Sequence, residues 1–134
     1  MTSWADELTP VDDEALEPFY PNVDEFVRGY LLPNWRRPCG SGGVTWCGRW
    51  WEHAEAITRL EALWESWEQA RLAEGAGMAV WWRDYADPHM AALTDAQSGP
   101  FTKCRADIGR HEVLPLWQAT PAPVGLFRDA RTEA

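Results

Sequence analysis

The stretch Thr45-Trp46-Cys47-Gly48-Arg49-Trp50-Trp51-Glu52-His53-Ala54-Glu55-Ala56 decides the fold of this chain. It carries a cysteine and a histidine six positions apart, three tryptophans and the start of the longest helical pattern in the sequence. Thiolate and imidazole are ligands that zinc prefers in proteins. The stretch therefore predicts a helix and half of a metal site, with Cys47 in a loop and His53 in the first turn of the helix.

Apolar residues from this stretch onward recur at spacings of three and four, which predicts an amphipathic helix over 52–74. We expect Gly75 and Gly77 to end this helix. Its buried stripe consists of Ala56, Leu60, Leu63, Trp64, Trp67 and Ala70.

A second helical pattern follows over 78–94. Asp87 fits an N-cap and Pro88 the first position of a new turn, so two helices are expected here, although one kinked helix also fits the sequence. Together with the first pattern, this segment predicts a helical hairpin that packs through tryptophans.

The segments on either side of the hairpin are shorter. Asn22 and Glu25 fit a capping box at the start of a helix over 23–32, which Pro33 is expected to end. On the other side of the hairpin, residues 101–111 fit either a short helix or a knuckle-like loop. The chain is thus predicted to be mainly α-helical.

The domain organisation follows from length and charge. A chain of 134 residues fits one domain. We expect an acidic flexible arm over 1–18, a helical domain over 19–127 and a tail over 128–134. No segment resembles a signal peptide or a membrane span, which favours a cytoplasmic protein with no membrane partner.

A second cysteine–histidine pair, Cys104 and His111, lies about fifty residues after Cys47 and His53. Two thiolates and two imidazoles complete a tetrahedral zinc site, and the two thiolates neutralise the ion. The alternative is two buried, inert cysteines and two ordinary histidines. His89 and Cys39 are further candidate ligands.

Two functions besides a structural site fit parts of the pattern. His53-Ala54-Glu55 matches the H-x-E half of the zinc nucleobase-deaminase signature, and Glu52 or Glu55 could act as the general base of a zinc hydrolase. The P-C-x-x-C half is missing, since Lys103 precedes Cys104 and no cysteine follows it. Four protein ligands would also fill the position that a catalytic water needs.

Nucleic-acid binding is the other alternative. Trp35, Arg36, Arg37 and Arg49 could stack on and neutralise a nucleic acid. The net charge of −9 argues against a protein-wide nucleic-acid surface. Arginines that cover the faces of core tryptophans would give the same pattern.

The motif W-C-x-x-W-W-x-H-x-E-A at 46–56 and the later Gly99-Pro100-Phe101-x-x-Cys104 with His111 resemble an actinobacterial family known as a domain of unknown function. The resemblance covers about 19–127 and includes both cysteine–histidine pairs. It implies a setting on actinobacterial chromosomes, plasmids or phages, and it brings no established activity. We therefore expect a non-enzymatic interaction module with a structural zinc site and an unknown protein partner.

Overall fold

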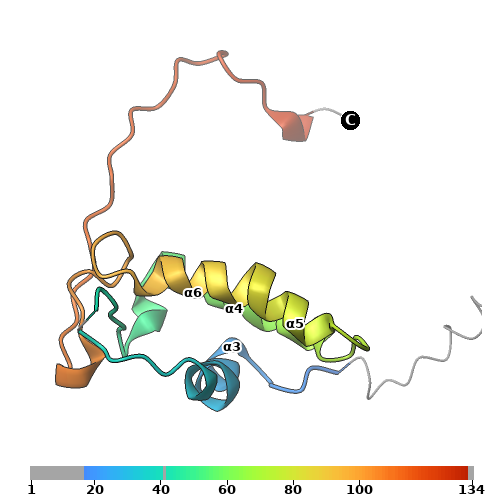
Figure 1. The fold of residues 1–134 in the computed structure, drawn as a ribbon. Helices are drawn as coiled ribbons and strands as arrows, with labels where there is room; N and C mark the ends of the chain where they lie inside the picture. Colours follow the sequence, from blue (N-terminus) through green and yellow to red (C-terminus); the bar gives the residue numbers. More distant parts are fainter. Residues whose placement is uncertain (1–16, 41, 133–134) are drawn as a thin grey trace, which may run out of the picture.

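The computed structural model describes residues 17–40 and 42–132. The prediction of a mainly helical fold is confirmed: the described residues form no strand, only the isolated β-bridges Val44–Asp95 and Arg105–Arg110. A helical hairpin dominates the body (Figure 1). Its first arm is α4 (Ala54–Ala70), and its second is the continuous run of α5 (Gly77–Trp81), η4 (Trp82–Ala86) and α6 (Asp87–Thr94).

Helix α4 buries most of the predicted stripe, with Trp64 and Ala70 only partly buried. Ala56, Leu60 and Leu63 are fully buried and Trp67 is nearly so. The helix is shorter at both ends than the predicted 52–74. At its start, residues Trp50–Glu52 form a separate 3₁₀ turn, η3, and His53 has extended backbone angles, φ −109° and ψ 116°.

The second arm of the hairpin is one continuous helical run, so of the two forms that the sequence allowed the single helix is the one found, and the break expected at Asp87-Pro88 is absent. Asp87 is a helical residue, with φ −59° and ψ −50°, rather than an N-cap. Gly77 begins α5 instead of ending the preceding helix. A Cβ at Gly77 would lie 2.7 Å from the Cβ of Ala73, so glycine allows the chain to approach the end of α4 closely.

A π-helical turn explains how the helix passes Pro88. In a regular α-helix the proline ring would meet the carbonyl of the residue four positions earlier. In η4 the Asp87 N–H instead bonds to the carbonyl of Trp82, five positions back, which widens the helix just before the proline.

The same arrangement precedes Pro33. Helix α3 (Val23–Phe26) continues through the π-helical turn η1 (Val27–Leu31), in which the Leu32 N–H bonds to the Val27 carbonyl. The α- and π-helical part therefore ends at Leu31, one residue before the predicted end at 32, and Pro33 lies in the 3₁₀ turn η2 (Leu32–Asn34) that follows. The N-cap prediction is confirmed, because the Asn22 side chain accepts the Glu25 N–H at 3.0 Å.

An aromatic core joins α3 and η1 to the hairpin. Phe26 and Trp81 are almost completely buried, and Trp67 contacts Phe26 and Tyr30 at ring-centroid distances of 5.5 and 4.8 Å. The indole N–H of Trp81 donates to Ser66 of α4 at 2.9 Å. The tryptophans thus hold the two arms of the hairpin together, as the sequence predicts.

The N-terminal described segment is fastened to α4 by one carboxylate. Glu68 accepts the backbone N–H groups of Phe19 at 2.7 Å and Tyr20 at 2.9 Å, the Trp64 indole N–H at 3.0 Å and the Arg71 guanidinium at 2.8 Å. Burial by itself would raise the pKa of Glu68, but these hydrogen bonds outweigh it and hold the pKa below its usual 4.5.

Glu68 is expected to make the free energy of unfolding fall as the pH is lowered. Because its folded-state pKa is depressed, its contribution is full above the unfolded-state pKa and is lost as the pH falls through the folded-state value. Glu68→Gln is expected to lower the free energy of unfolding by about 1–3 kcal/mol at pH 7 and to flatten the acid side of the profile. Urea unfolding between pH 7 and pH 3 measures this, with the exposed Glu65→Gln as control. Equal losses of unfolding free energy in Glu68→Gln and Glu65→Gln would show that Glu68 is not the source of this pH dependence.

Two loop segments and the end of α6 meet at one end of the hairpin, where the candidate site lies. The Thr45 N–H bonds to the Thr94 carbonyl at 2.8 Å, and the Ala106 N–H bonds to the Trp46 carbonyl at 2.9 Å. The segment before η3 is therefore held between the end of α6 and the loop that follows Phe101.

After the site, the chain extends away from the helical body as an arm over 113–129 (Figure 1) and ends the described part with η6 (Ala130–Thr132). The predicted acidic arm over 1–18 lies outside the described residues except for Glu17 and Pro18. None of the helices in the described ranges is both long enough and apolar enough to cross a bilayer.

Candidate metal centre

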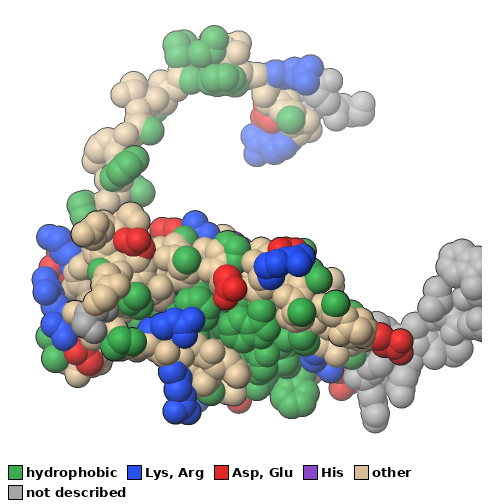
Figure 2. Space-filling view, viewed as in Figure 1, with side chains coloured by type: hydrophobic (Ala, Val, Ile, Leu, Met, Phe, Trp, Pro, Cys, Tyr) green, Lys and Arg blue, Asp and Glu red, His purple; other side chains and the backbone are tan. Residues whose placement is uncertain are grey.

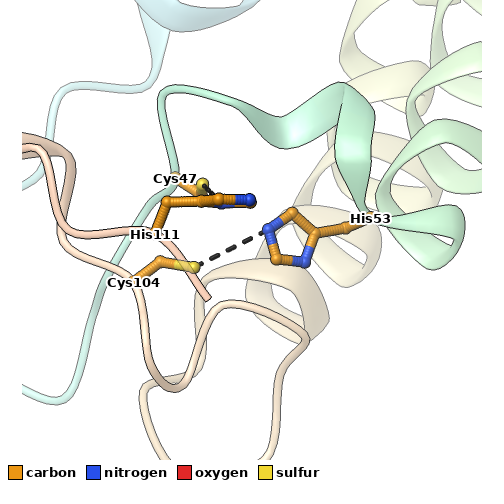
Figure 3. Close-up of side chains that lie close together, drawn as sticks. All are labelled: Cys47, His53, Cys104 and His111. Atoms are coloured by element: carbon orange, nitrogen blue, oxygen red, sulfur yellow. Dashed lines mark hydrogen bonds between the residues drawn. The ribbon is translucent and has the colours of Figure 1, made fainter. Parts of the chain in front are cut away.

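The two cysteine–histidine pairs come together at the end of the hairpin (Figure 3). One ligand atom from each of Cys47, His53, Cys104 and His111 can be chosen so that all four lie within 4.8 Å of one another. Cys47, His53 and Cys104 are buried, and His111 is partly buried. These four residues could ligate a metal ion.

The first pair is positioned by the short turn η3. The Glu52 N–H bonds to the Arg49 carbonyl and the His53 N–H to the Trp50 carbonyl, both at 3.0 Å. Trp50 is only 4% exposed and fixes the turn in the core. His53 therefore lies just before α4, not in its first turn as predicted, and its side chain faces the second pair.

The second pair flanks a tight reversal of the chain. Arg105 and Arg110 exchange two backbone hydrogen bonds of 2.9 Å, with the 3₁₀ turn η5 (Ala106–Ile108) between them. Gly109 closes the turn at φ +69°, a left-handed conformation that favours glycine. Of the two predicted forms of 101–111, the structure shows the knuckle-like loop, with Cys104 and His111 at its two ends.

Phe101 packs beside the cluster. Its ring is fully buried and lies edge-on to His53 at 4.9 Å and to Trp46 at 5.1 Å between centroids. The Thr45 hydroxyl donates to the Cys104 carbonyl and joins the two ligand-bearing segments directly. The centre thus has an apolar wall, which strengthens electrostatic interactions inside it.

The orientation of His111 is set by Glu52. His111 Nε2 lies 2.7 Å from a Glu52 carboxylate oxygen, and its Nδ1 lies 3.1 Å from Cys47 Sγ. A carboxylate on the outer nitrogen fixes the tautomer of a ligating histidine, so the Nδ1 lone pair points into the cluster. The sequence suggested Glu52 as a possible general base of a zinc hydrolase. No spacing rule could reveal this contact, because it joins residues on two distant segments.

The other histidine and thiol form a second contact. His53 Nε2 lies 3.6 Å from Cys104 Sγ, and the Glu112 N–H points at the same sulfur at 3.4 Å. Four donors around one zinc ion would be separated by about 3.3–3.8 Å, given usual Zn–N and Zn–S bond lengths. The contacts of 3.1 and 3.6 Å are close to that range, whereas other separations in the group reach up to 4.8 Å, so the donors would move together by up to about 1 Å around an ion.

The electrostatics favour a cation at this place. Burial raises the pKa of the Cys47 thiol to about 11, so its thiolate requires a positive charge beside it. Burial, and then the neighbouring His111, lower the pKa of His53, which keeps its imidazole neutral and able to ligate. Burial opposes ionisation of Glu52, but hydrogen bonds from Arg49 and His111 hold its pKa below the usual value.

The chain was compared with known proteins. A model of the family described as Domain of unknown function (DUF4913) matches residues 20–123, which include all four candidate ligands. The chain belongs to the DUF4913 family. No curated protein and no solved structure gives a significant match. A family of unknown function is what the sequence resemblance implied.

The remaining candidate ligands of the DUF4913 domain lie elsewhere. Among the described residues, neither Cys39 nor His89 belongs to the cluster. Cys39 is 3.8 Å from the Thr45 hydroxyl, and the ring of His89 contacts Arg59 at 3.0 Å.

The Trp/Arg candidates for nucleic-acid binding separate into two places. Trp35, Arg36 and Arg37 line one cavity, with the Arg37 guanidinium 4.1 Å from the Trp35 ring and Trp82 stacked at 6.4 Å. Arg49 instead pairs with Glu52 beside the cluster. The Trp35 ring therefore has both an arginine and a second indole as neighbours in the DUF4913 domain.

Removal of the Glu52 carboxylate, which contacts the candidate ligand His111, is expected to weaken metal binding at this centre. Glu52→Ala leaves the outer nitrogen of His111 without its acceptor, so the metal dissociation constant of the DUF4913 domain should rise about 10–100-fold. Competition with a chromophoric chelator measures this change. Glu55→Ala is the matched control, because Glu55 pairs with Arg59 at 2.9 Å and is not part of the cluster. An equal effect of the two variants would contradict the role of Glu52.

Proposed function

We propose that Cys47, His53, Cys104 and His111 bind one structural zinc ion, and that the protein is a non-enzymatic interaction module built on this metal clip. The observation that carries the proposal is the meeting of four donor atoms within 4.8 Å, contributed by two segments that the hairpin separates.

The donor set favours zinc over other ions. Two thiolates and two imidazoles suit a tetrahedral zinc site, whereas magnesium and calcium prefer oxygen ligands. The two thiolates balance the charge of the ion, so the site can be buried without an uncompensated charge. In this role the ion joins the loop before α4 to the knuckle after α6.

A structural role fits the geometry better than a catalytic one. Four protein donors complete a tetrahedron and leave no position for a reactive water. Neither candidate general base supports hydrolysis, since Glu52 is engaged by Arg49 and His111 and Glu55 is engaged by Arg59. The proposal therefore includes no turnover.

Substitution of zinc by Co²⁺ tests the donor set. The metal-free protein titrated with Co²⁺ is expected to develop the visible absorption of a tetrahedral ion and a thiolate charge-transfer band, both saturating at one equivalent. Cys104→Ala should weaken the charge-transfer band, whereas Cys39→Ala should leave the spectrum unchanged. An octahedral spectrum, or equal loss in both variants, would contradict the proposal.

Nucleic-acid binding through Trp35, Arg36, Arg37 and Arg49 receives less support. A stacking platform needs an exposed aromatic face, and the Trp35 ring already has the Arg37 guanidinium 4.1 Å from its centroid and is only partly exposed. We expect no salt-sensitive shift with single- or double-stranded DNA. Binding at low salt that Arg36→Ala and Arg37→Ala abolish would favour the alternative.

The process that the module serves is proposed from the sequence resemblance alone. That resemblance points to actinobacterial hosts and to their plasmids and phages. A protein partner suits a module of this kind, since the chain has a net charge of −9 and would be repelled by nucleic acid.

A further inference from the structure

A cavity of the helical body lies apart from the four candidate metal ligands. It has a volume of about 300 Å³ and is formed where the segment after η2 meets the end of α6 and the knuckle. Small-molecule sites in proteins usually measure about 300–1,000 Å³ and are mostly apolar. The cavity therefore has the size of a site for a small ligand. Its apolar lining consists of Leu32, Trp35, Val44, Trp46 and Ala106.

Backbone hydrogen bonds hold the walls of the cavity together. The Gly40 N–H bonds to the Val44 carbonyl at 2.8 Å, within the loop that follows η2. The bonds from Thr45 to α6 and from Ala106 to Trp46, described above, join this loop to the other two walls. A cavity whose walls are already connected needs little ordering when a ligand enters, which favours binding.

The hydroxyl groups in the lining are already engaged. Thr45 Oγ1 donates to the Cys104 carbonyl, and Thr94 Oγ1 donates to the Met90 carbonyl at 2.7 Å. Cys39, which also lines the cavity, offers only a thiol, a weak hydrogen-bonding group. A polar group placed here would lose its water without gaining a good partner, so a hydrocarbon group suits this part of the cavity.

Two arginines supply positive charge to the same lining. Arg36 and Arg37 are exposed, and within residues 17–40 and 42–132 neither forms an ion pair with a carboxylate. Arg36 donates its Nε–H to the Pro33 carbonyl, and Arg37 donates one N–H to the Arg36 carbonyl, both at 3.2 Å. A guanidinium carries five N–H donors, so each arginine keeps several donors for a ligand.

Other basic side chains at this end of the molecule have partners. Figure 2 shows Lys and Arg side chains gathered over the loop end of the body. Of these residues, Lys103 pairs with Glu112, and Arg105 pairs with Asp107. Arg49 pairs with Glu52, as described above. Arg36 and Arg37 are thus cations that line a cavity and lack a counter-ion in the described part of the chain.

The charge of the chain favours a ligand with a single negative charge. An arginine fork binds a carboxylate through two parallel hydrogen bonds. The chain carries a formal charge of −9, so a second negative charge on the ligand would add repulsion. One carboxylate therefore suits the site better than a phosphate dianion.

The positions of charge and apolar surface favour a short ligand. The Arg37 guanidinium lies 4.1 Å from the centre of the Trp35 ring, and both residues line the cavity. A carboxylate attached by one or two bonds to an apolar group can therefore reach the arginines and the indole wall together. The volume limits that apolar group to one ring or a short branched chain.

We propose that the Trp35–Trp46 cavity binds a small monocarboxylate that carries one apolar ring or a branched aliphatic chain. The carboxylate pairs with Arg36 and Arg37, and the apolar group contacts the two tryptophans. This inference goes beyond the proposed function, because it adds a small-molecule site that none of the four candidate metal ligands lines.

Titration of the full chain with phenylacetate, followed by ¹H–¹⁵N NMR, tests the proposal. The indole signals of Trp35 and Trp46 are expected to shift and to saturate, with a dissociation constant on the order of 0.1 mM for so small a ligand. Trp51 does not line the cavity, so its indole signal should not move. Trp35→Phe and Trp46→Phe assign the two signals.

A ligand series separates charge from apolar contact. Phenylacetamide has nearly the same shape without the charge and should bind at least about tenfold more weakly. Acetate lacks the ring and should lose at least about tenfold as well. Phenyl phosphate, which carries the second negative charge, should also bind more weakly than phenylacetate.

Paired variants test the arginines. Arg36→Gln/Arg37→Gln is expected to raise the dissociation constant of phenylacetate about tenfold and to leave that of phenylacetamide unchanged. Both side chains are exposed, so the double variant should keep the NMR spectrum of a folded chain. Arg110→Gln is the matched control, because Arg110 is exposed and does not line the cavity, and it should bind phenylacetate like the unaltered chain.

Absence of saturable shifts up to about 10 mM phenylacetate, a hundred times the expected constant, would overturn the inference. Equal binding of phenylacetate and phenylacetamide, or an unchanged constant in Arg36→Gln/Arg37→Gln, would overturn the carboxylate contact. Acetate or phenyl phosphate binding as tightly as phenylacetate would overturn the assigned ligand class. The zinc content of the same samples decides the proposed function separately, since one zinc per chain without phenylacetate binding would leave that function intact.

Discussion

Removal of the metal with a strong chelator is expected to lower the melting temperature of the DUF4913 domain by roughly 15 °C. A metal present at a thousandfold excess over its dissociation constant stabilises the folded state by about 4 kcal/mol, and a chain of this size loses a few degrees per kcal/mol. A metal bound by the four candidate ligands would close the loop between Cys47 and Cys104, a long connection for which such a closure contributes most. Calorimetry before and after chelation measures the shift, and Cys104→Ala should reproduce it.

Hydrogen exchange shows which segments lose stability when the metal is removed. Protection should fall first around Cys47–His53 and Cys104–His111, because these loops depend on the ion, whereas α4 keeps its aromatic core. Cys39→Ala is the matched control and should melt like the unaltered protein. A Cys104→Ala variant that keeps stoichiometric zinc and melts unchanged would contradict the structural role of the site.

Trp81→Ala is expected to cost about 3–5 kcal/mol in the free energy of unfolding, the range for deleting a buried aromatic side chain. Trp81 is 1% exposed, contacts Phe26 and Tyr30 at ring-centroid distances of 6.3 and 6.2 Å, and donates a 2.9 Å hydrogen bond to Ser66. It therefore joins three helical segments at once. Urea unfolding followed by tryptophan fluorescence or circular dichroism measures the loss.

Two further variants distinguish the contribution of the Trp81 hydrogen bond from the effect of removing an exposed tryptophan. Ser66→Ala should cost about 1–2 kcal/mol, because it leaves the buried indole N–H of Trp81 unpaired. Trp51→Ala should cost less than about 0.5 kcal/mol, because Trp51 is half exposed. A loss in Trp81→Ala no larger than in Trp51→Ala would show that the tryptophan core does not hold the hairpin.

The parts of the fold that local periodicity encodes could be predicted from the sequence. The stripe from Ala56 to Trp67 repeats at helical spacing and is buried as expected. The Asn22 cap depends on residues three positions apart, and it too was predictable. Both features are local, so sequence neighbours determine them.

The behaviour of the prolines was not predictable in this way. Pro33 and Pro88 normally end or break a helix, yet here each follows a π-helical turn that removes the clash. The hydrogen bond from the Asp87 N–H to the Trp82 carbonyl, five positions back, departs from α-helical geometry, and no residue spacing indicates it.

The candidate site was predictable in its residues but not in its geometry. Cysteines and histidines in two pairs indicate four donors, whereas only the fold shows that they meet. The contact of Glu52 with His111 joins residues from two segments, and no spacing encodes it. The residues from Leu114 onward fit an extended segment followed by a Pro/Ala-rich strap or loose tail, although the boundary of the predicted domain places them inside 19–127, and the structure shows Val113 to Phe127 as an exposed arm.

The most direct measurement is the metal content of the protein purified without added metal, determined by elemental mass spectrometry on chains counted by amino-acid analysis. We expect one zinc per chain in the unaltered protein and in Cys39→Ala, and less than about a tenth of an equivalent in the Cys47→Ala/Cys104→Ala double variant. An unaltered protein that is folded and metal-free, or a double variant that keeps its zinc, would show that these residues do not form a structural zinc site.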